Sequence, residues 1–239
     1  MIEYLSSFSQ NFAAWIAVYP ENWAVWSPQL GRAAVVTLQL TVLSFALAVV
    51  LGLMLALGKL SKLRPLRIFC SAYIEVARGI PTLAILFLLY YGLVPVGLVL
   101  DAFVASVIGL GMTAAGYIAE VFRAGIEAVH KGQREAALAV GMTPGKSFRY
   151  IILPQAIRVI MPPLLNMLII LLKDTSVCSL ISTPELMLRA KDIAMMSFLP
   201  MHLFLLVGGM YFLMSWPLSI ITRRVELRMQ QGLGGTRQP

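Results

Sequence analysis

Long apolar runs alternate with short clusters of charged residues along most of this chain. A helix needs about 20 predominantly apolar residues to cross a hydrocarbon core of about 30 Å. Five stretches meet this requirement, at about 35–58, 80–100, 103–122, 159–182 and 201–222. The pattern therefore predicts an all-α polytopic membrane protein with five transmembrane helices.

The first 34 residues do not read as a further span. They are interrupted by polar residues and prolines, namely Glu3, Pro20, Glu21, Asn22 and Pro28. Three tryptophans, Trp15, Trp23 and Trp26, are typical of a segment lying at a membrane surface. We therefore expect residues 1–34 to be an extracytoplasmic, interfacial segment. No basic region precedes an apolar core here, so we expect no cleaved signal peptide.

The basic residues predict the orientation of the spans. Fifteen of the 19 Lys and Arg residues fall in segments 59–79, 123–158 and 223–239, and three fall on the other side of the predicted spans. Because cytoplasmic loops carry an excess of Lys and Arg, these three segments should lie in the cytoplasm. The N-terminus is then outside and the C-terminal tail inside, as an odd number of spans requires.

Composition agrees with a membrane protein and excludes other classes. Hydrophobic residues make up 59% of the 239 residues and charged residues 13%, with a mean hydropathy of +0.83. An ordinary soluble enzyme or a disordered chain does not have this balance. We attribute the net charge of +8 to the cytoplasmic loops and not to nucleic-acid binding. The two cysteines and two histidines form no metal motif, and no nucleophile–base set is recognisable, so we expect neither a metal site nor catalysis.

The longest loop between spans, 123–158, predicts a rigid element on the cytoplasmic surface. Residues 135–140 favour a helix, and Gly141 is a typical residue to end it. Pro144 cannot continue a helix, whereas Thr143 or Ser147 can cap the next one. The result is a short helix–turn–helix between two spans, which suits it to contact a partner protein.

This loop resembles the EAA signature of permease subunits of ATP-binding-cassette (ABC) importers. The matching residues are Glu135, Ala136, Ala137, Gly141, Ile151, Leu153 and Pro154, at the family spacing and without a gap. The resemblance implies a coupling helix that docks into a groove on a separate ATPase subunit. Glu135 and Gly141 would lie at that contact.

Three further stretches are similar to the polar amino acid uptake branch of the family, which includes histidine, glutamine, arginine and opine permeases. They are GYIAEVFRAGI (116–126), LLKDTSVCSLIS (171–182) and ARGIPTLAILFLLYYG (77–92). The resemblance implies a multi-pass subunit of the bacterial inner membrane that moves a polar amino acid inward. It also implies three kinds of protein partner: a second permease subunit, identical or homologous, a cytoplasmic ATPase dimer and an extracytoplasmic binding protein.

No ATP site is expected on this chain. The stretch 141–147 looks like a phosphate-binding loop, but its glycines are separated by three residues instead of four, and Pro144 interrupts it. ATP and Mg²⁺ would then bind to the partner ATPase, and this chain would bind no cofactor.

Charged residues inside a span are costly, at about 2.5–3.5 kcal/mol each at the membrane centre. Lys173 and Asp174 are adjacent in the fourth span, and Thr175 and Ser176 follow. Adjacent helical residues point about 100° apart, so either each charge has its own partner or the helix loosens here. A site with a carboxylate, a cation and hydroxyls is suited to bind an amino acid. In this interpretation Asp174 contacts the ammonium group of the substrate, and Lys173 or backbone N–H groups contact its carboxylate. A salt bridge between helices, or a gate, is an equal alternative.

The third span carries a polar stripe. Thr113, Tyr117 and Glu120 stand at i, i+4 and i+7, on one helical face, and are candidates to line the substrate path. Glu120 is also three residues from Arg123, so an ion pair within the helix is equally expected.

Another class of function stays open at this stage. A channel or ion-coupled transporter without an ATPase would use Lys173 and Asp174 as an ion or proton relay. Such a protein has no need of the EAA loop, which therefore favours the importer.

Overall fold

The computed structural model describes residues 2–231, and side chains within residues 11–229. These residues form helices joined by short turns, and no strand occurs in the described range, so the all-α prediction is confirmed. The longer elements are α1 (Ile2–Lys59), α2 (Arg64–Gly79), α4 (Ala102–Glu127), α7 (Leu153–Asp174), α8 (Leu186–Ser197) and α9 (Pro200–Gln231). The shorter ones are α3 (Thr82–Phe87), η1 (Leu88–Gly92), η2 (Val94–Val96), α5 (Lys131–Ala139), α6 (Pro144–Ser147), η3 (Phe148–Ile152) and η4 (Thr175–Ile181).

Four helical segments are long and apolar enough to cross a membrane. They are Asn11–Lys59, Ala102–Glu127, Pro144–Ile181 and Pro200–Met229. A fifth span results if the pair Arg64–Gly79 and Thr82–Val96, bent by 104°, is taken as one broken span. The described part of the chain therefore holds four to five spans, against the five expected from sequence.

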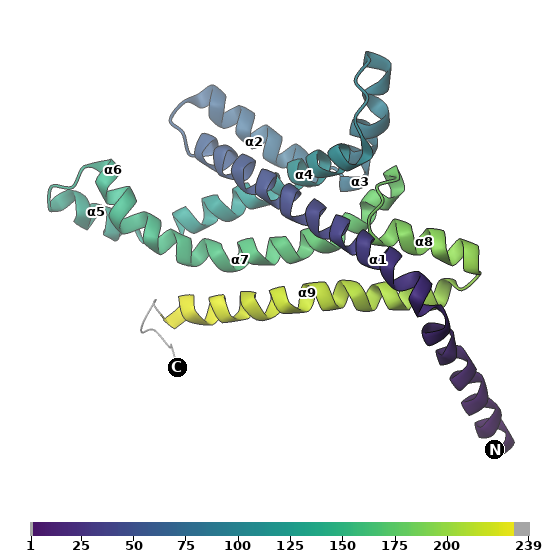
Figure 1. Cartoon of the computed structure of the whole chain (residues 1–239). Coiled ribbons are helices and arrows are strands. Elements are labelled where there is room, and N and C mark those ends of the chain that lie inside the picture. The colour runs from purple at the N-terminus through teal and green to yellow at the C-terminus, as the bar shows by residue number, and fades with distance from the viewer. Residues whose placement is uncertain (1, 232–239) are drawn as a thin grey trace.

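Helix α1 differs from the expected boundary near residue 35. It is one helix of 58 residues that includes Pro20 and Pro28, and its N-terminal part extends away from the other helices (Figure 1). A proline inside a helix removes one backbone donor and crowds the carbonyl four residues earlier, but this can kink a helix without ending it, and the turns between the two prolines still form. The amide of Asn22 also donates to the carbonyl oxygen of Val18, at 2.9 Å, within the same turn.

The stretch expected as a span at 80–100 is not one continuous helix. Helix α2 ends at Gly79, and Ile80 is extended, with φ −97° and ψ 133°. A residue before proline is pushed out of the helical region, so Pro81 enforces this break and the chain restarts as α3 in another direction. Segment 59–79, expected as a loop, is mostly α2, which packs against α1 and α4.

Helix α4 forms the centre of the fold, because small residues allow its neighbours to approach closely. A Cβ added at Gly52 of α1 would lie 2.8 Å from a methyl carbon of Ile118, and one at Gly116 would lie 2.9 Å from the Cβ of Ala77 on α2. The apolar cluster around α4 includes the fully buried Leu86 and Ile118. Helices α7 and α9 pack beside this centre, with α5 and α6 at one end and α8 at the other (Figure 1).

A buried polar cluster holds α8 in place. Glu185 is fully buried and caps α8, since its carboxylate accepts hydrogen bonds from the backbone N–H groups of Met187 (2.9 Å) and Leu188 (2.8 Å). The hydroxyl of Tyr211 on α9 donates to the same carboxylate at 2.7 Å. Thr37 of α1 accepts from the N–H of Leu186 at 3.1 Å, so three helices meet here. Burial raises the pKa of the Glu185 carboxyl.

Candidate substrate cavity and coupling loop

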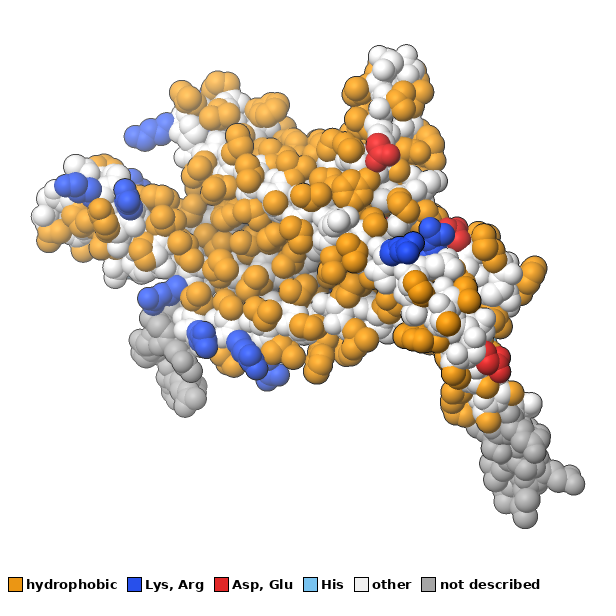
Figure 2. Space-filling model, in the orientation of Figure 1, with side chains coloured by type: hydrophobic (Ala, Val, Ile, Leu, Met, Phe, Trp, Pro, Cys, Tyr) orange, Lys and Arg blue, Asp and Glu red, His pale blue; other side chains and the backbone are white. Residues whose placement is uncertain are grey.

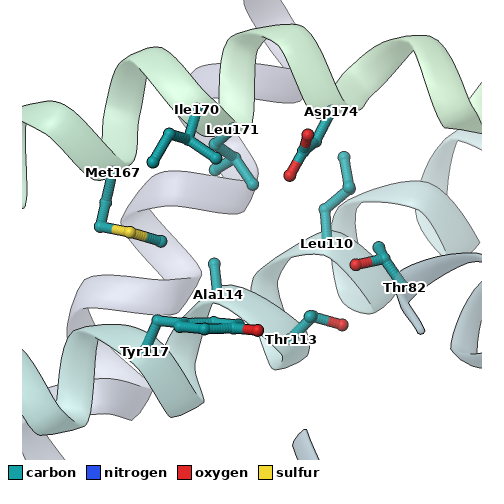
Figure 3. Close-up of a pocket in the computed structure, with 9 residues that line it drawn as sticks. All are labelled: Thr82, Leu110, Thr113, Ala114, Tyr117, Met167, Ile170, Leu171 and Asp174. Carbon is teal, nitrogen blue, oxygen red and sulfur yellow. The ribbon is translucent and has the colours of Figure 1, made fainter. Parts of the chain in front are cut away.

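A cavity of about 290 Å³ lies between α4 and α7, close to the start of α3 (Figure 3). Its lining residues are Thr82, Leu110, Thr113, Ala114, Tyr117, Met167, Ile170, Leu171 and Asp174. Three of these, Thr113, Tyr117 and Asp174, are candidates that the sequence suggested independently on two different spans. The walls are mostly apolar, with polar groups at a few positions, which is typical of a small-molecule site.

Asp174 is the only charged residue among those that line this cavity. It is the last residue of α7, and the 3-10 helix η4 begins at Thr175. The helix therefore changes its geometry at this point, as one of the two sequence alternatives required. Asp174 projects from α7 toward the side chains of α4 (Figure 3), whereas Lys173 is exposed and does not line the cavity.

Thr113 and Tyr117 form the wall contributed by α4. The Thr113 hydroxyl is buried and donates to the carbonyl oxygen of Gly109 at 3.0 Å, which leaves its oxygen able to accept a further hydrogen bond. The Tyr117 hydroxyl donates to the carbonyl oxygen of Arg78 at 3.4 Å, and the Arg78 guanidinium lies 5.6 Å from the centre of the Tyr117 ring. A cation thus stands beside the wall opposite Asp174.

Glu120, the third member of the polar stripe, lies outside the cavity. Its carboxylate pairs with Lys59 at the end of α1, at 2.7 Å, and with Arg123, also at 2.7 Å. The stripe divides because one end of α4 faces the cavity and the other end faces the last turn of α1. These ion pairs tie α1 to α4.

The hydroxyls that follow Asp174 also lie outside the cavity. Thr175 is buried and donates to the carbonyl oxygen of Leu172 at 2.7 Å, and Ser176 donates to that of Lys173 at 2.8 Å. Both bonds satisfy carbonyl groups at the end of α7, so these residues serve the change from α7 to η4.

Sequence reasoning did not single out Arg78 or Thr82. Arg78 lies in the last turn of α2 and Thr82 directly after Pro81, and the break at that proline turns the chain so that both meet the α4 wall. The signal available in the sequence was the proline within an apolar run, which marks a probable helix boundary.

The loop between α4 and α7 forms a helix–turn–helix. Helix α5 ends at Ala139, and Gly141 has a φ of +82°, a conformation that glycine adopts without strain. The N–H of Met142 donates to the carbonyl oxygen of Ala137 at 3.1 Å, which closes the helix end. Thr143 caps α6 by accepting from the N–H of Lys146 at 3.3 Å.

The remaining signature residues connect this loop to α7. Glu135 and Ala136 are exposed on α5, whereas Ala137 is buried. Ile151 lies in the π-helix η3, and Leu153 and Pro154 form the first turn of α7. The loop therefore presents one face of α5 outward while its other face contacts η3.

No group of three or more His, Cys, Asp or Glu side chains within the described residues is arranged to hold a metal ion.

Comparison with known proteins matches residues 48–231 to the family model described as "binding-protein-dependent transport system inner membrane component". The probable amino-acid ABC transporter permease protein YckA of Bacillus subtilis (strain 168) is 38% identical, over 84% of this chain and 89% of the relative. The L-cystine transport system permease protein TcyB of the same organism is 36% identical, over 91% and 92%.

The fold is likewise similar to that of a solved transporter. A chain in the crystal structure of an amino acid ABC transporter with histidines superposes with a TM-score of 0.83 and 37% identity, covering 87% of this chain and 97% of that one. This chain is a membrane-spanning transport protein and belongs to the family of binding-protein-dependent transport system inner membrane components.

Proposed function

We propose that this chain is the permease subunit of an ABC importer that carries a polar amino acid, or an opine-like derivative, into the cytoplasm. The observation that carries the proposal is the α4–α7 cavity with the single carboxylate of Asp174, in a chain whose relatives are named as amino-acid permeases. The cavity is small, largely apolar and built from two candidate spans, as a site along a membrane path should be.

In this proposal the Asp174 carboxylate binds the α-ammonium group of the substrate. A charged hydrogen bond to the ammonium offsets the cost of holding a carboxylate in an apolar cavity. Thr113 offers an acceptor on the opposite wall. Lys173 is not the partner of the substrate carboxylate, because it is exposed outside the cavity. Arg78 is also exposed and is not among the lining residues, but its guanidinium lies 5.6 Å from the centre of the Tyr117 ring, which does line the cavity, so we assign that role to Arg78.

The coupling surface is the exposed face of α5 together with Gly141. The ATPase dimer would bind ATP and Mg²⁺, and Glu135 and Gly141 would lie at its contact with this chain. ATP binds the closed ATPase dimer more tightly than the open one, and this difference in affinity drives the change between states. Movement of the loop then opens the path outward, and hydrolysis returns the inward-facing state.

The orientation follows from charge. Lys and Arg side chains gather around α5 and α6 and along the C-terminal end of α9 (Figure 2). We infer that this end faces the cytoplasm of a bacterium across its inner membrane, with the N-terminus and α8 outside. An extracytoplasmic binding protein would approach from the α8 side, and a second permease subunit would complete the path.

An ion or proton relay through Lys173 and Asp174 is less well supported. The two side chains do not share one cavity, and they are not paired with each other within the described residues. Family membership also gives the coupling loop a role that an ATPase-independent transporter does not require.

Uptake of labelled amino acids tests the proposal. Cells with and without the gene are compared for energy-dependent uptake of a basic, an acidic and a neutral polar amino acid, and the affected class identifies the substrate. Asp174→Asn should then reduce that uptake by at least tenfold, because the charged hydrogen bond to the ammonium is lost. Lys173→Gln is the matched control and should leave uptake within about twofold. Equal losses in both variants would contradict the assignment of Asp174.

A further inference from the structure

A second polar cavity, of about 490 Å³, lies between α7 and α9. Its lining residues are Pro162, Pro163, Asn166, Ile169, Ser219, Thr222, Arg223 and Glu226. It shares no lining residue with the α4–α7 cavity. The substrate site does not account for it.

The position of this cavity along α9 corresponds to the level of lipid headgroups. Arg223 lies 23 residues after Pro200, the start of α9. At 1.5 Å per residue this is about 35 Å, slightly more than the hydrocarbon thickness of about 30 Å. Lys and Arg side chains gather at the same end of α9 in Figure 2. A polar cavity with a basic residue between two spans at this depth is in contact with the headgroup layer of one leaflet.

The chemistry of the lining matches a phosphodiester. Arg223 supplies a guanidinium, which forms paired hydrogen bonds to phosphate oxygens. Asn166 supplies an exposed amide on the groove side of α7. Because this amide is exposed, it is accessible to a ligand in the groove. These two side chains are the donors available to a phosphate.

The other polar groups match the rest of a headgroup. Ser219 donates to the carbonyl oxygen of Ser215 at 3.1 Å, and Thr222 donates to that of Leu218 at 2.9 Å. Their oxygens therefore act toward a ligand as acceptors. Acceptors suit the hydroxyls of a glycerol headgroup or the ammonium of an ethanolamine headgroup, and they would repel a second phosphate.

We propose that the groove between α7 and α9 is a binding site for the headgroup of a membrane phospholipid, with Arg223 and Asn166 at its phosphodiester and Ser219 and Thr222 at its glycerol or ethanolamine part. Cytoplasmic segments of membrane proteins generally carry an excess of arginine. That excess alone does not require a polar cavity between two helices or an amide on α7, so it does not explain this arrangement. A lipid held there would fix the spacing of α7 and α9.

Native mass spectrometry of the purified transporter complex tests this site. The complex is stripped of lipid and titrated with phosphatidylglycerol, phosphatidylethanolamine and diacylglycerol of identical acyl chains. We expect one or both phospholipids to bind at least tenfold more tightly than diacylglycerol, which lacks the phosphate. Comparing the first two lipids distinguishes a glycerol from an ethanolamine headgroup, and either result supports the site.

Arg223→Gln should weaken phospholipid binding by about tenfold, which corresponds to about 1.4 kcal/mol. Arg224→Gln is the matched control, since it removes the same charge from the adjacent residue, which does not line the cavity. Equal effects of the two substitutions, or diacylglycerol binding as well as the phospholipids, would overturn the proposal. If Arg223→Gln disrupts the complex, Ser219→Trp fills the cavity and keeps the charge. Retention of the lipid in that variant would equally overturn it.

Discussion

The buried carboxylate of Glu185 should be among the most sensitive positions for stability in this chain. Replacing it with alanine removes the acceptor for three partly buried donors, the N–H groups of Met187 and Leu188 and the hydroxyl of Tyr211. Each buried donor left without a partner costs about 1–3 kcal/mol. Because water can enter part of the space left by the side chain, we expect Glu185→Ala to lower the free energy of unfolding by about 3–5 kcal/mol.

Unfolding by sodium dodecyl sulfate in mixed micelles, followed by tryptophan fluorescence, measures this loss. Asp192→Ala is the matched control on the same helix, α8. Asp192 is partly exposed and its contact with Arg189 is long, at 3.8 Å, so its removal should cost less than about 1 kcal/mol. A loss for Glu185→Ala no larger than that of the control would refute the reasoning that three satisfied donors hold α8 to α9.

The remaining predictions concern pH, packing and the coupling loop. Burial raises the pKa of Glu185 above its usual value of 4.5, so the folded state binds this proton more tightly than the unfolded state. The advantage is fully present below pH 4.5 and is lost as the pH rises through the raised pKa, so the free energy of unfolding of wild type, measured relative to that of Glu185→Gln, should be lower at pH 8 than at pH 4. Gly52→Leu should disrupt the packing of α1 on α4 and cost about 2–4 kcal/mol in the same unfolding assay, whereas Gly31→Leu, with nothing within 4 Å of its Cβ, should be nearly neutral. Gly141→Asp should strain the backbone at φ +82° and release the ATPase on co-purification, while Gly145→Asp, which has no positive φ, should retain it.

The sequence predicted those features that depend on periodicity within one helix. Thr113 and Tyr117, one turn apart on a span, line the same cavity, and the end of α5 before Gly141 follows from glycine's conformational freedom. Lys173 and Asp174 show the same rule, since adjacent positions on a helix point to different surroundings. The local sequence pattern was enough to predict each of these features, because the face of a helix on which a residue lies does not depend on distant segments of the chain.

Features that depend on distant segments were not predictable in this way. Glu120 leaves the cavity because the end of α1 brings Lys59 within 2.7 Å, a contact between residues 61 positions apart. Glu185 was not singled out because its partner Tyr211 lies on another helix, 26 residues later. The two prolines in α1 favoured a boundary that the structure does not have, since a proline can be accommodated inside a long helix without ending it.

One element joins the two regions to which we assign function. Helix α7 begins at Leu153, directly after the coupling loop, and ends at Asp174 in the cavity, so its 22 residues span about 33 Å. The backbone hydrogen bonds of a continuous helix resist changes in length, so a displacement at its first turn moves its last turn as well. Bending is easiest where the helix is least regular, which is in the π-helix η3 before it, in the 3-10 helix η4 after it, and at Pro162 and Pro163, which lack backbone donors inside α7. If the ATPase displaces α5, the carboxylate of Asp174 therefore moves relative to the α4 wall, and the cavity changes shape without any direct contact between nucleotide and substrate.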